Sequence, residues 1–455
     1  METITYKMAK LTDGVSFEQF DKKTIETTKR FLLDSIGCAY GGSQTHDVKI
    51  MVDFYNEAGG AQQATVINSA QKLPMLSQSL LNSLMIRALD YNDIYWEEDP
   101  SHPSDLIPAA LTPAEYLHKP GKDFLTAMIV AYEWEMRLCE FAKPGVRERK
   151  WHHATLTQYA SPFAAGKILG LSAEEMVHAA GISGSHNLTL GAVTAGNLTM
   201  MKNTVDPMAV QSGVQAALLA QRGYEGPEHV MDGKEGLTEA LGERFELNIL
   251  TDNFGEDFRI NRCSMKAFPT EALTHTPMSA IIKLMRDNNI SKDDIEEVTI
   301  RTVARAADIL SDPSKYNPQT RETADHSLPY CLSACIVDGT VTPASFTQEK
   351  IMDKEIRSFL PKIKVTAEPE FEKTFPALKQ AGAKILTKQK KSFEITLDYP
   401  LGDYREPMDD ATLLKKFDAM VLPVIGQDKR DRIVDAIMNI EKETDMADFM
   451  NLLEG

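Results

Sequence analysis

Cysteine, tryptophan and long apolar runs are scarce in this chain of 455 residues. It has 5 cysteines and 3 tryptophans. The closest cysteines, Cys331 and Cys335, lack the CxxC spacing of zinc and redox sites. We therefore expect buried, reduced thiols in a cytoplasmic protein. No run approaches the roughly 18 apolar residues of a membrane-spanning helix, and residues 1–10 lack the apolar core of a signal peptide.

Positive charge is also in deficit. The chain has 49 Lys and Arg against 66 Asp and Glu, which gives a formal net charge of −17 at pH 7. A surface this acidic repels phosphate backbones and anionic lipids, so we expect no nucleic-acid or membrane partner. The length allows two or three domains with a core that needs no disulfides.

The motifs that bind common cofactors are missing. The chain contains no GxGxxG after a strand, no GxxxxGK[ST], no HExxH and no GxSxG, which leaves nicotinamide, nucleotide, zinc-hydrolase and serine-hydrolase chemistry without support. If the chain is an enzyme, we expect its side chains to act alone, with no metal and no cofactor.

Helical patterns dominate the first 260 residues. Ser16 precedes an apolar stripe that ends at Gly41 and Gly42, a cap and stop signal for a helix. Similar patterns predict helices over 74–90, 104–118, 122–140, 153–169, 173–183 and 206–222. From Asp409 to the end the pattern is helical again. We expect this tail to pack back onto the helical body.

Alternating apolar and polar residues appear after residue 262. They predict strands over 296–303, 363–368, 383–387 and 392–399, interleaved with helices over 276–288, 327–337 and 346–358. The predicted fold class is therefore mostly α with a second α+β domain. A helical domain of residues 1–262 is completed by 400–455, and the α+β domain spans 263–399.

Acidic and imidazole side chains collect near the ends of the predicted helices. Asp90 lies at the C-terminal end of one helix, where a carboxylate is unfavourable unless it bonds something specific or is exposed. His102 precedes Ser104, the expected N-cap of the next helix. His152 and His153 open another helix, whose positive end lowers an imidazole pKa and binds anions. Taken singly, these residues are also explained as loop or capping residues.

Two lysine segments complete the candidate set. Lys202 lies between a methionine pair and the start of a helix, and a lysine in such a place often only snorkels to solvent. Lys266 opens a segment that runs to His275 at the predicted domain boundary, a favoured place for a ligand cleft. A carboxylate, imidazoles and two ammonium groups together suit proton abstraction next to a substrate carboxylate.

These segments resemble the MmgE/PrpD family. The matching motifs are LDYND at 89–93, HPSD at 102–105, WHHAT at 151–155, Lys202 eleven residues before Gly213, KAFPTE at 266–271 and RETADHSLPY at 321–330. They occur in order along nearly the whole chain. The resemblance implies a helical domain with a smaller α+β lid, a homodimer, and catalysis without a metal or organic cofactor.

The resemblance also implies roles for individual residues. Asp90, His102, His153, Lys202 and Lys266 match the family's active-site positions, and the lysines are expected to face substrate carboxylates. Three further residues are expected to bind substrate: Glu271, His275 and Tyr330.

Two of these residues bear on the reaction. Glu271 falls where dehydratase members tend to have glutamate and decarboxylases histidine. His275 stands nine residues after Lys266, as a histidine does in some decarboxylases.

The function that this resemblance favours is a cofactor-independent lyase acting on a small polycarboxylate. We expect elimination of water like that of 2-methylcitrate dehydratase in propionate catabolism. A base, His102 or His153 oriented by Asp90, would remove a proton α to a carboxylate. The alternatives are a cis-aconitate-type decarboxylase, an iminodicarboxylate epimerase, and an inactive binding protein derived from the family.

Overall fold

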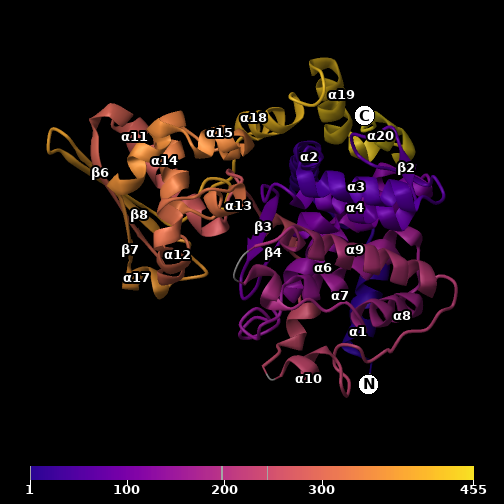
Figure 1. Cartoon of the computed structure of the whole chain (residues 1–455). Helices are drawn as coiled ribbons and strands as arrows, with labels where there is room; N and C mark the ends of the chain where they lie inside the picture. Colours follow the sequence, from indigo (N-terminus) through magenta and orange to yellow (C-terminus); the bar gives the residue numbers. More distant parts are fainter. Residues whose placement is uncertain (1, 196–197, 243) are drawn as a thin grey trace. The chain divides into compact units, whose positions relative to one another are not determined.

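The chain forms two compact units in a computed structural model that describes residues 2–195, 198–242 and 244–455 (Figure 1). Unit 1 comprises Met1–Cys263 and Leu414–Gly455, and unit 2 is Ser264–Leu413. The described residues are mostly helical with small sheets, which confirms the helical part of the predicted fold class. The domain boundaries expected at 262/263 and 399/400 stay a prediction. No described helix combines the length and apolar character that crossing a membrane requires.

Unit 1 is built mainly from α-helices. Their bounds are α1 Ile4–Gly14, α2 Lys22–Gly42, α3 His46–Ala58, α4 Met75–Arg87, α5 Ile107–Tyr116, α6 Gly121–Leu138, α7 Ala154–Leu169, α8 Ala173–Gly184, α9 Met201–Ala220, α10 Leu237–Leu241, α19 Gln427–Met438 and α20 Met446–Leu452. Helix α18, Asp410–Val421, runs across the boundary between the units. Two antiparallel pairs of short strands accompany the helices, β1 Ala64–Thr65 with β2 Lys72–Leu73 and β3 Asp93–Trp96 with β4 Pro100–Ser101.

Three details of the predicted helices need correction. Helices α1 and α3 were not predicted. Ser16 caps only the short 3-10 turn η1, Phe17–Gln19, whereas Asp21 caps α2 by accepting a hydrogen bond from the Thr24 amide at 2.7 Å. The helix predicted over 206–222 begins at Met201 and runs through Pro207. Proline removes one helical hydrogen bond there, but contacts with α4, α7 and α8 hold α9 in place.

Helices α7 and α9 form the centre of unit 1 (Figure 1). Every residue of α7 except Lys167 is buried. Small side chains allow this close packing: a Cβ on Gly213 of α9 would lie only 2.0 Å from the Ser161 hydroxyl oxygen of α7. Asp206, near the start of α9, lies 3.2 Å from Thr157, near the start of α7, so the two helices bring their N-terminal groups close together.

Gly42 is required by the packing of α2 on α4. A Cβ at this position would lie 2.0 Å from the Met85 carbonyl oxygen, a rigid backbone atom. We expect Gly42→Ala to lower the free energy of unfolding by about 1–3 kcal/mol through overpacking, measured by urea denaturation. Gly14→Ala is the control, since nothing lies within 4 Å of a Cβ at that helical position. Equal stability of the two variants would contradict this explanation.

Unit 2 contains a four-stranded sheet in the order β7-β6-β8-β9. The strands are β6 Ile295–Thr302, β7 Ile363–Ala367, β8 Ala381–Thr387 and β9 Ser392–Leu397. Strands β6 and β7 are parallel and the other pairs antiparallel, with Val298 opposite Ile363 and Lys384 opposite Glu394. Apolar alternation located these strands to within two residues.

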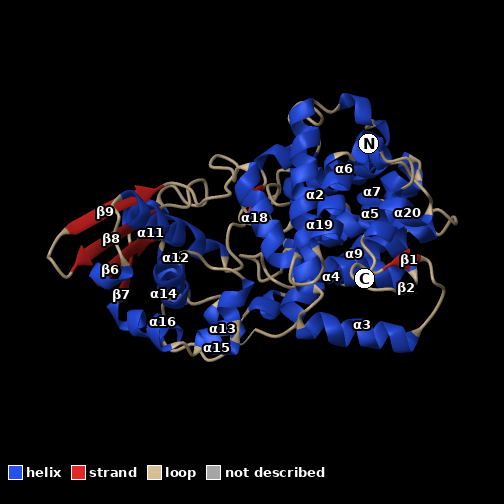
Figure 2. Cartoon of the chain, turned by 90° about the horizontal axis from the view of Figure 1, so that it is seen from above, coloured by secondary structure: helices blue, strands red, loops and turns tan. Residues whose placement is uncertain are grey.

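Helices pack against this sheet (Figure 2). Their bounds are α11 His275–Asp287, α12 Ala304–Ile309, α13 Arg321–Ala324, α14 Leu328–Asp338, α15 Gln348–Ile351, α16 Lys354–Phe359 and α17 Pro369–Glu372. Helix α11 contacts β8 and β9, and α14 contacts β7. The helix predicted over 346–358 is broken into α15 and α16, because Asp353 caps a new helix by accepting from the Glu355 and Ile356 amides.

Candidate active site

Asp90 is held between two cations just after α4. Its backbone has a φ of +51°, a left-handed conformation that aspartate tolerates better than most residues. The carboxylate accepts hydrogen bonds from Arg87 Nη1 at 2.6 Å and from Lys202 Nζ at 2.9 Å. These charges offset the unfavourable position at a helix C-terminus. Of the two expectations for an acid at this place, a specific bond or exposure to solvent, the first holds for Asp90, which is buried.

Lys202 reaches Asp90 from the first turn of α9. Only 13% of its side chain is exposed, so it does not snorkel into solvent. Arg87, fully buried, also lies 3.6 Å from the Asp105 carboxylate through its Nε. Nearby carboxylates outweigh the cost of burial and raise the pKa of Arg87, so it stays charged.

His102 is fixed by a backbone carbonyl. Its Nδ1 lies 2.6 Å from the Asp93 carbonyl oxygen. His102, and not Ser104, is the N-cap of the 3-10 helix η2, Pro103–Leu106. The Ser104 hydroxyl and amide instead donate to the Asp93 carboxylate at 2.7 and 3.0 Å. Since a carbonyl can only accept, Nδ1 carries a proton, and Nε2 carries the lone pair of the neutral ring.

His153 lies at the N-cap of α7, against Asp206 of α9. Its Nε2 is 3.3 Å from Asp206 Oδ2, and its ring centroid is 5.7 Å from that of His102. Burial would raise the pKa of Asp206, but the charges of His153 and Arg87 outweigh it and hold the pKa well below the ordinary value. Asp206 is therefore an ionised carboxylate facing one of the two candidate histidines.

His152 differs from its neighbour in both bonding and charge. Its Nδ1 accepts a hydrogen bond from the Ala154 amide at 3.2 Å. Burial lowers its pKa well below 6.5, and the adjacent His153 lowers it further. His152 is therefore neutral at physiological pH and serves to shape the start of α7.

One group among the described residues has the geometry of a metal site. Ligand atoms of His152, His153 and Asp206 lie within 4.8 Å of one another. However, Nδ1 of His152 already accepts a backbone hydrogen bond. Only Nε2 of His152 could therefore act as a ligand beside His153 and Asp206. Arg87 and Arg147 also act electrostatically on His152.

The predicted residues of unit 2 divide between a turn and the interior. Lys266 Nζ donates to the Thr270 carbonyl oxygen at 3.2 Å, and His275 Nε2 lies 3.3 Å from the same oxygen. Glu271 accepts from the Leu273 amide at 2.7 Å and caps the next turn.

Tyr330 is placed differently from the residues of this turn. Its buried hydroxyl donates to the Ser345 carbonyl oxygen at 2.6 Å. Burial raises the pKa of Tyr330, so the hydroxyl keeps its proton. The structure gives this side chain a role in packing unit 2.

Sequence reasoning missed three groups of the site in unit 1. Arg87 stands three residues before Asp90, and Asp206 stands four residues after Lys202. These spacings place the members of each pair on one face or at one end of a helix. The late predicted start of α9 concealed the second pair. Glu135, fully buried on α6, carries no local signal.

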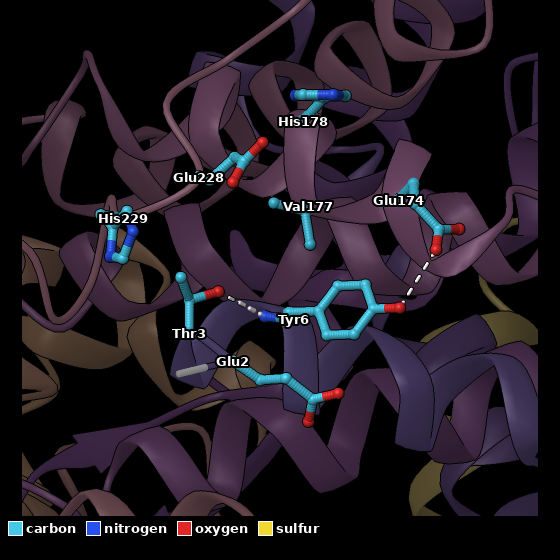
Figure 3. Close-up of a pocket in the computed structure, with 8 residues that line it drawn as sticks. All are labelled: Glu2, Thr3, Tyr6, Glu174, Val177, His178, Glu228 and His229. Carbon is cyan, nitrogen blue, oxygen red and sulfur yellow. Dashed lines mark hydrogen bonds between the residues drawn. The ribbon is translucent and has the colours of Figure 1, made fainter.

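A cavity of about 250 Å³ lies elsewhere in unit 1, beside α1 and α8 (Figure 3). Tyr6 donates a hydrogen bond to Glu174 across it at 3.1 Å. None of the predicted site residues lines it. The lining residues are Glu2, Thr3, Tyr6, Glu174, Val177, His178, Glu228 and His229.

Fold and site together define a mostly helical protein with buried imidazole, carboxylate and cationic groups gathered in unit 1. The chain belongs to the MmgE/PrpD family. The family's N-terminal domain matches residues 6–250 and its C-terminal domain residues 268–442, which confirms the predicted family.

Named relatives carry two different activities. Cis-aconitate decarboxylase from Homo sapiens is 24% identical over 465 residues, covering 100% of this chain and 95% of the relative. The same enzyme from Aspergillus terreus (strain NIH 2624 / FGSC A1156) is 24% identical over 476 residues, covering 99% and 96%. 2-Methylcitrate dehydratase from Escherichia coli (strain K12) is 25% identical over 432 residues, covering 87% and 85%.

Proposed function

We propose that this protein is a lyase that removes a proton α to a carboxylate of a small polycarboxylate and expels water. The observation that carries the proposal is the pair of buried imidazoles, His102 and His153, 5.7 Å apart in a unit where two cations hold Asp90. Imidazoles transfer protons near neutral pH, and cations stabilise the carboxylates and the developing enediolate.

His102 is the base in this proposal. Because Nδ1 donates to the Asp93 carbonyl, the lone pair of the neutral ring is on Nε2. Nε2 takes the α proton, and the C–H electron pair becomes the new carbon–carbon double bond. The carbonyl contact fixes the tautomer and the ring orientation before substrate binds.

His153 is the matching acid. The Asp206 carboxylate, 3.3 Å from Nε2, stabilises the protonated ring. As the C–O bond breaks, His153 gives its proton to the departing hydroxyl, which leaves as water. We expected Asp90 to orient a histidine. In this proposal Asp206 orients His153, and Asp90 instead orients Lys202 and Arg87.

Decarboxylation of a cis-aconitate-like acid is the second candidate. One specific observation favours it: His275 and Lys266 bind the same Thr270 carbonyl oxygen, so an imidazole accompanies an ammonium group in unit 2. Such a pair suits protonation of the carbanion left by loss of carbon dioxide. Relatives carrying the name cis-aconitate decarboxylase also cover nearly the whole chain.

Proton NMR in D2O distinguishes these reactions. The purified, chelator-treated protein is incubated separately with 2-methylcitrate, citrate, cis-aconitate and an iminodisuccinate. An alkene formed from 2-methylcitrate supports elimination, and itaconate formed from cis-aconitate supports decarboxylation. Deuterium entering a substrate without elimination indicates epimerisation. Four unchanged substrates would contradict the proposal for these acids.

Lys266→Ala tests the contribution of unit 2. We expect KM for a polycarboxylate to rise about 10- to 100-fold, the effect of losing a hydrogen bond to a charged group, with a smaller rise for a substrate lacking one acid group. Steady-state kinetics measure both. Lys283→Ala is the control, because Lys283 is a half-buried lysine of the same unit that pairs with Asp287. An equal rise for both substrates would show that Lys266 binds no carboxylate.

A further inference from the structure

Glu135 is a buried acid that has no ion pair with any described residue. It is fully buried on α6, and its Oε1 is hydrogen-bonded to the Ser101 hydroxyl and, at 2.9 Å, to the Thr157 hydroxyl. No cation is among the principal groups that act on it. Glu133, two residues earlier on the same helix, is ion-paired instead. It accepts from Arg137 at 2.6 Å and from Arg259 at 3.1 Å.

The acids around Glu135 add to the cost of its charge. Asp206 and Asp93 both oppose its ionisation electrostatically. The arginines near α6 pair with other acids, Arg137 with Glu133 and Arg259 with Glu133 and Glu140. The other titratable groups facing this part of α6 are Asp105 of η2 and Cys139, whose pKa values burial and nearby acids raise.

The Thr157 hydroxyl lies between two carboxyl groups. It is 2.9 Å from Glu135 Oε1 and 3.2 Å from Asp206 Oδ1. A hydroxyl has one proton, so it can donate to only one of them. Two ionised carboxylates would therefore leave one oxygen–oxygen contact without a proton. A proton on one of the two acids would give both contacts a hydrogen bond.

The environment decides which acid carries this proton. His153 and Arg87 hold the pKa of Asp206 well below its ordinary value. Burial raises the pKa of Glu135 to about 8, although the Ser101 and Thr157 hydroxyls oppose the rise. The proton therefore belongs to Glu135.

We propose that Glu135 is a neutral carboxylic acid that donates to Thr157, which in turn donates to Asp206 and holds that carboxylate against His153. Glu135 is thus a positioning residue for the acid of the proposed function, and its effect on turnover rests on that function. The geometry sets the order of these hydrogen bonds, because Asp206 Oδ1 faces Thr157 and Oδ2 faces His153.

Infrared spectra test the proton directly. We expect the wild-type spectrum minus the Glu135→Gln spectrum at pH 6.5 to contain a protonated-carboxyl band, because this difference removes the signal of other buried acids such as Asp105. This difference band should disappear with a midpoint near pH 8. Glu133→Gln, which changes an ion-paired acid on the same helix, should keep the band. A difference spectrum without this band, or loss of the same band in Glu133→Gln, would overturn the proposal.

Unfolding measurements provide a second readout without substrate. Since folding raises the pKa of Glu135 from about 4.5 to about 8, the folded state holds a proton that the unfolded state releases in this window. Its contribution to stability is fully present below pH 4.5 and is lost as pH rises to 8. Glu135→Gln should flatten this slope, whereas Glu133→Gln keeps it. An unchanged slope in Glu135→Gln, or failure of that variant alone to fold, would overturn the proposal.

The pH profile of turnover tests the link to His153. When Glu135 ionises, its negative charge should repel Asp206. This repulsion should disturb the position of His153, the proposed acid, and lower kcat. We expect the alkaline limb of kcat to move to higher pH in Glu135→Gln. An identical limb in both enzymes overturns the positioning role. Absence of turnover with every carboxylate tested would instead concern the proposed function, and the infrared and unfolding results still decide where the proton lies.

Discussion

Replacing His153 by asparagine should lower kcat by about 10²- to 10⁴-fold, the usual contribution of a positioned acid or base. Asparagine retains polarity at the start of α7 but cannot deliver a proton. Asp206, 3.3 Å from Nε2, would lose its imidazole partner. Steady-state kinetics with the acid identified by NMR measure the effect, and circular dichroism checks the fold.

His118→Asn is the matched control for this prediction. His118 is largely exposed and pairs with Asp445 at 2.8 Å, within unit 1 but without contact to the site. Its replacement should leave kcat within about threefold of wild type, because removal of an exposed pair changes little. A His153→Asn variant as active as this control would eliminate His153 as the acid.

Lys416→Met should lower the free energy of unfolding by about 3–5 kcal/mol, since it removes one partner of a buried ion pair. Lys416 Nζ lies 2.6 Å from Asp34 Oδ1 and donates to the Tyr91 carbonyl oxygen at 2.7 Å. Burial raises the pKa of Asp34 even with Lys416 beside it. The unpaired Asp34 would therefore have to take up a proton.

Urea denaturation at several pH values checks this prediction. Lys415→Met is the control, because Lys415 is the exposed neighbour of Lys416 on the same helix. The Lys416→Met variant should lose stability further as pH rises, since its Asp34 binds a proton in the folded state above the pKa of the unfolded chain. A loss of stability no larger than that of Lys415→Met would show that the Lys416–Asp34 ion pair does not stabilise the fold as predicted. Because Tyr91 follows Asp90, a weakened substrate affinity should accompany the loss.

Local patterns predicted the fold class and many of the elements. Helices α4 to α8 were located because apolar periodicity and end signals are properties of neighbouring residues. Strand β6 was located because its apolar residues alternate. Helix α3 was not predicted, and Val48 is its one buried residue. The start of α9 was placed late because Pro207 resembles a helix opening.

The sequence by itself determined the family, the mostly helical class and the order of the candidate residues along the chain. Their partners and their protonation follow from contacts that form when distant segments fold together. Lys202 meets Asp90 across 112 residues, and Lys416 meets Tyr91 across 325. Whether a buried acid is ionised, like Asp206, or neutral, as we propose for Glu135, depends on burial and on charges brought from distant segments. No local pattern contains that information, because a pKa is set by the surroundings that folding assembles.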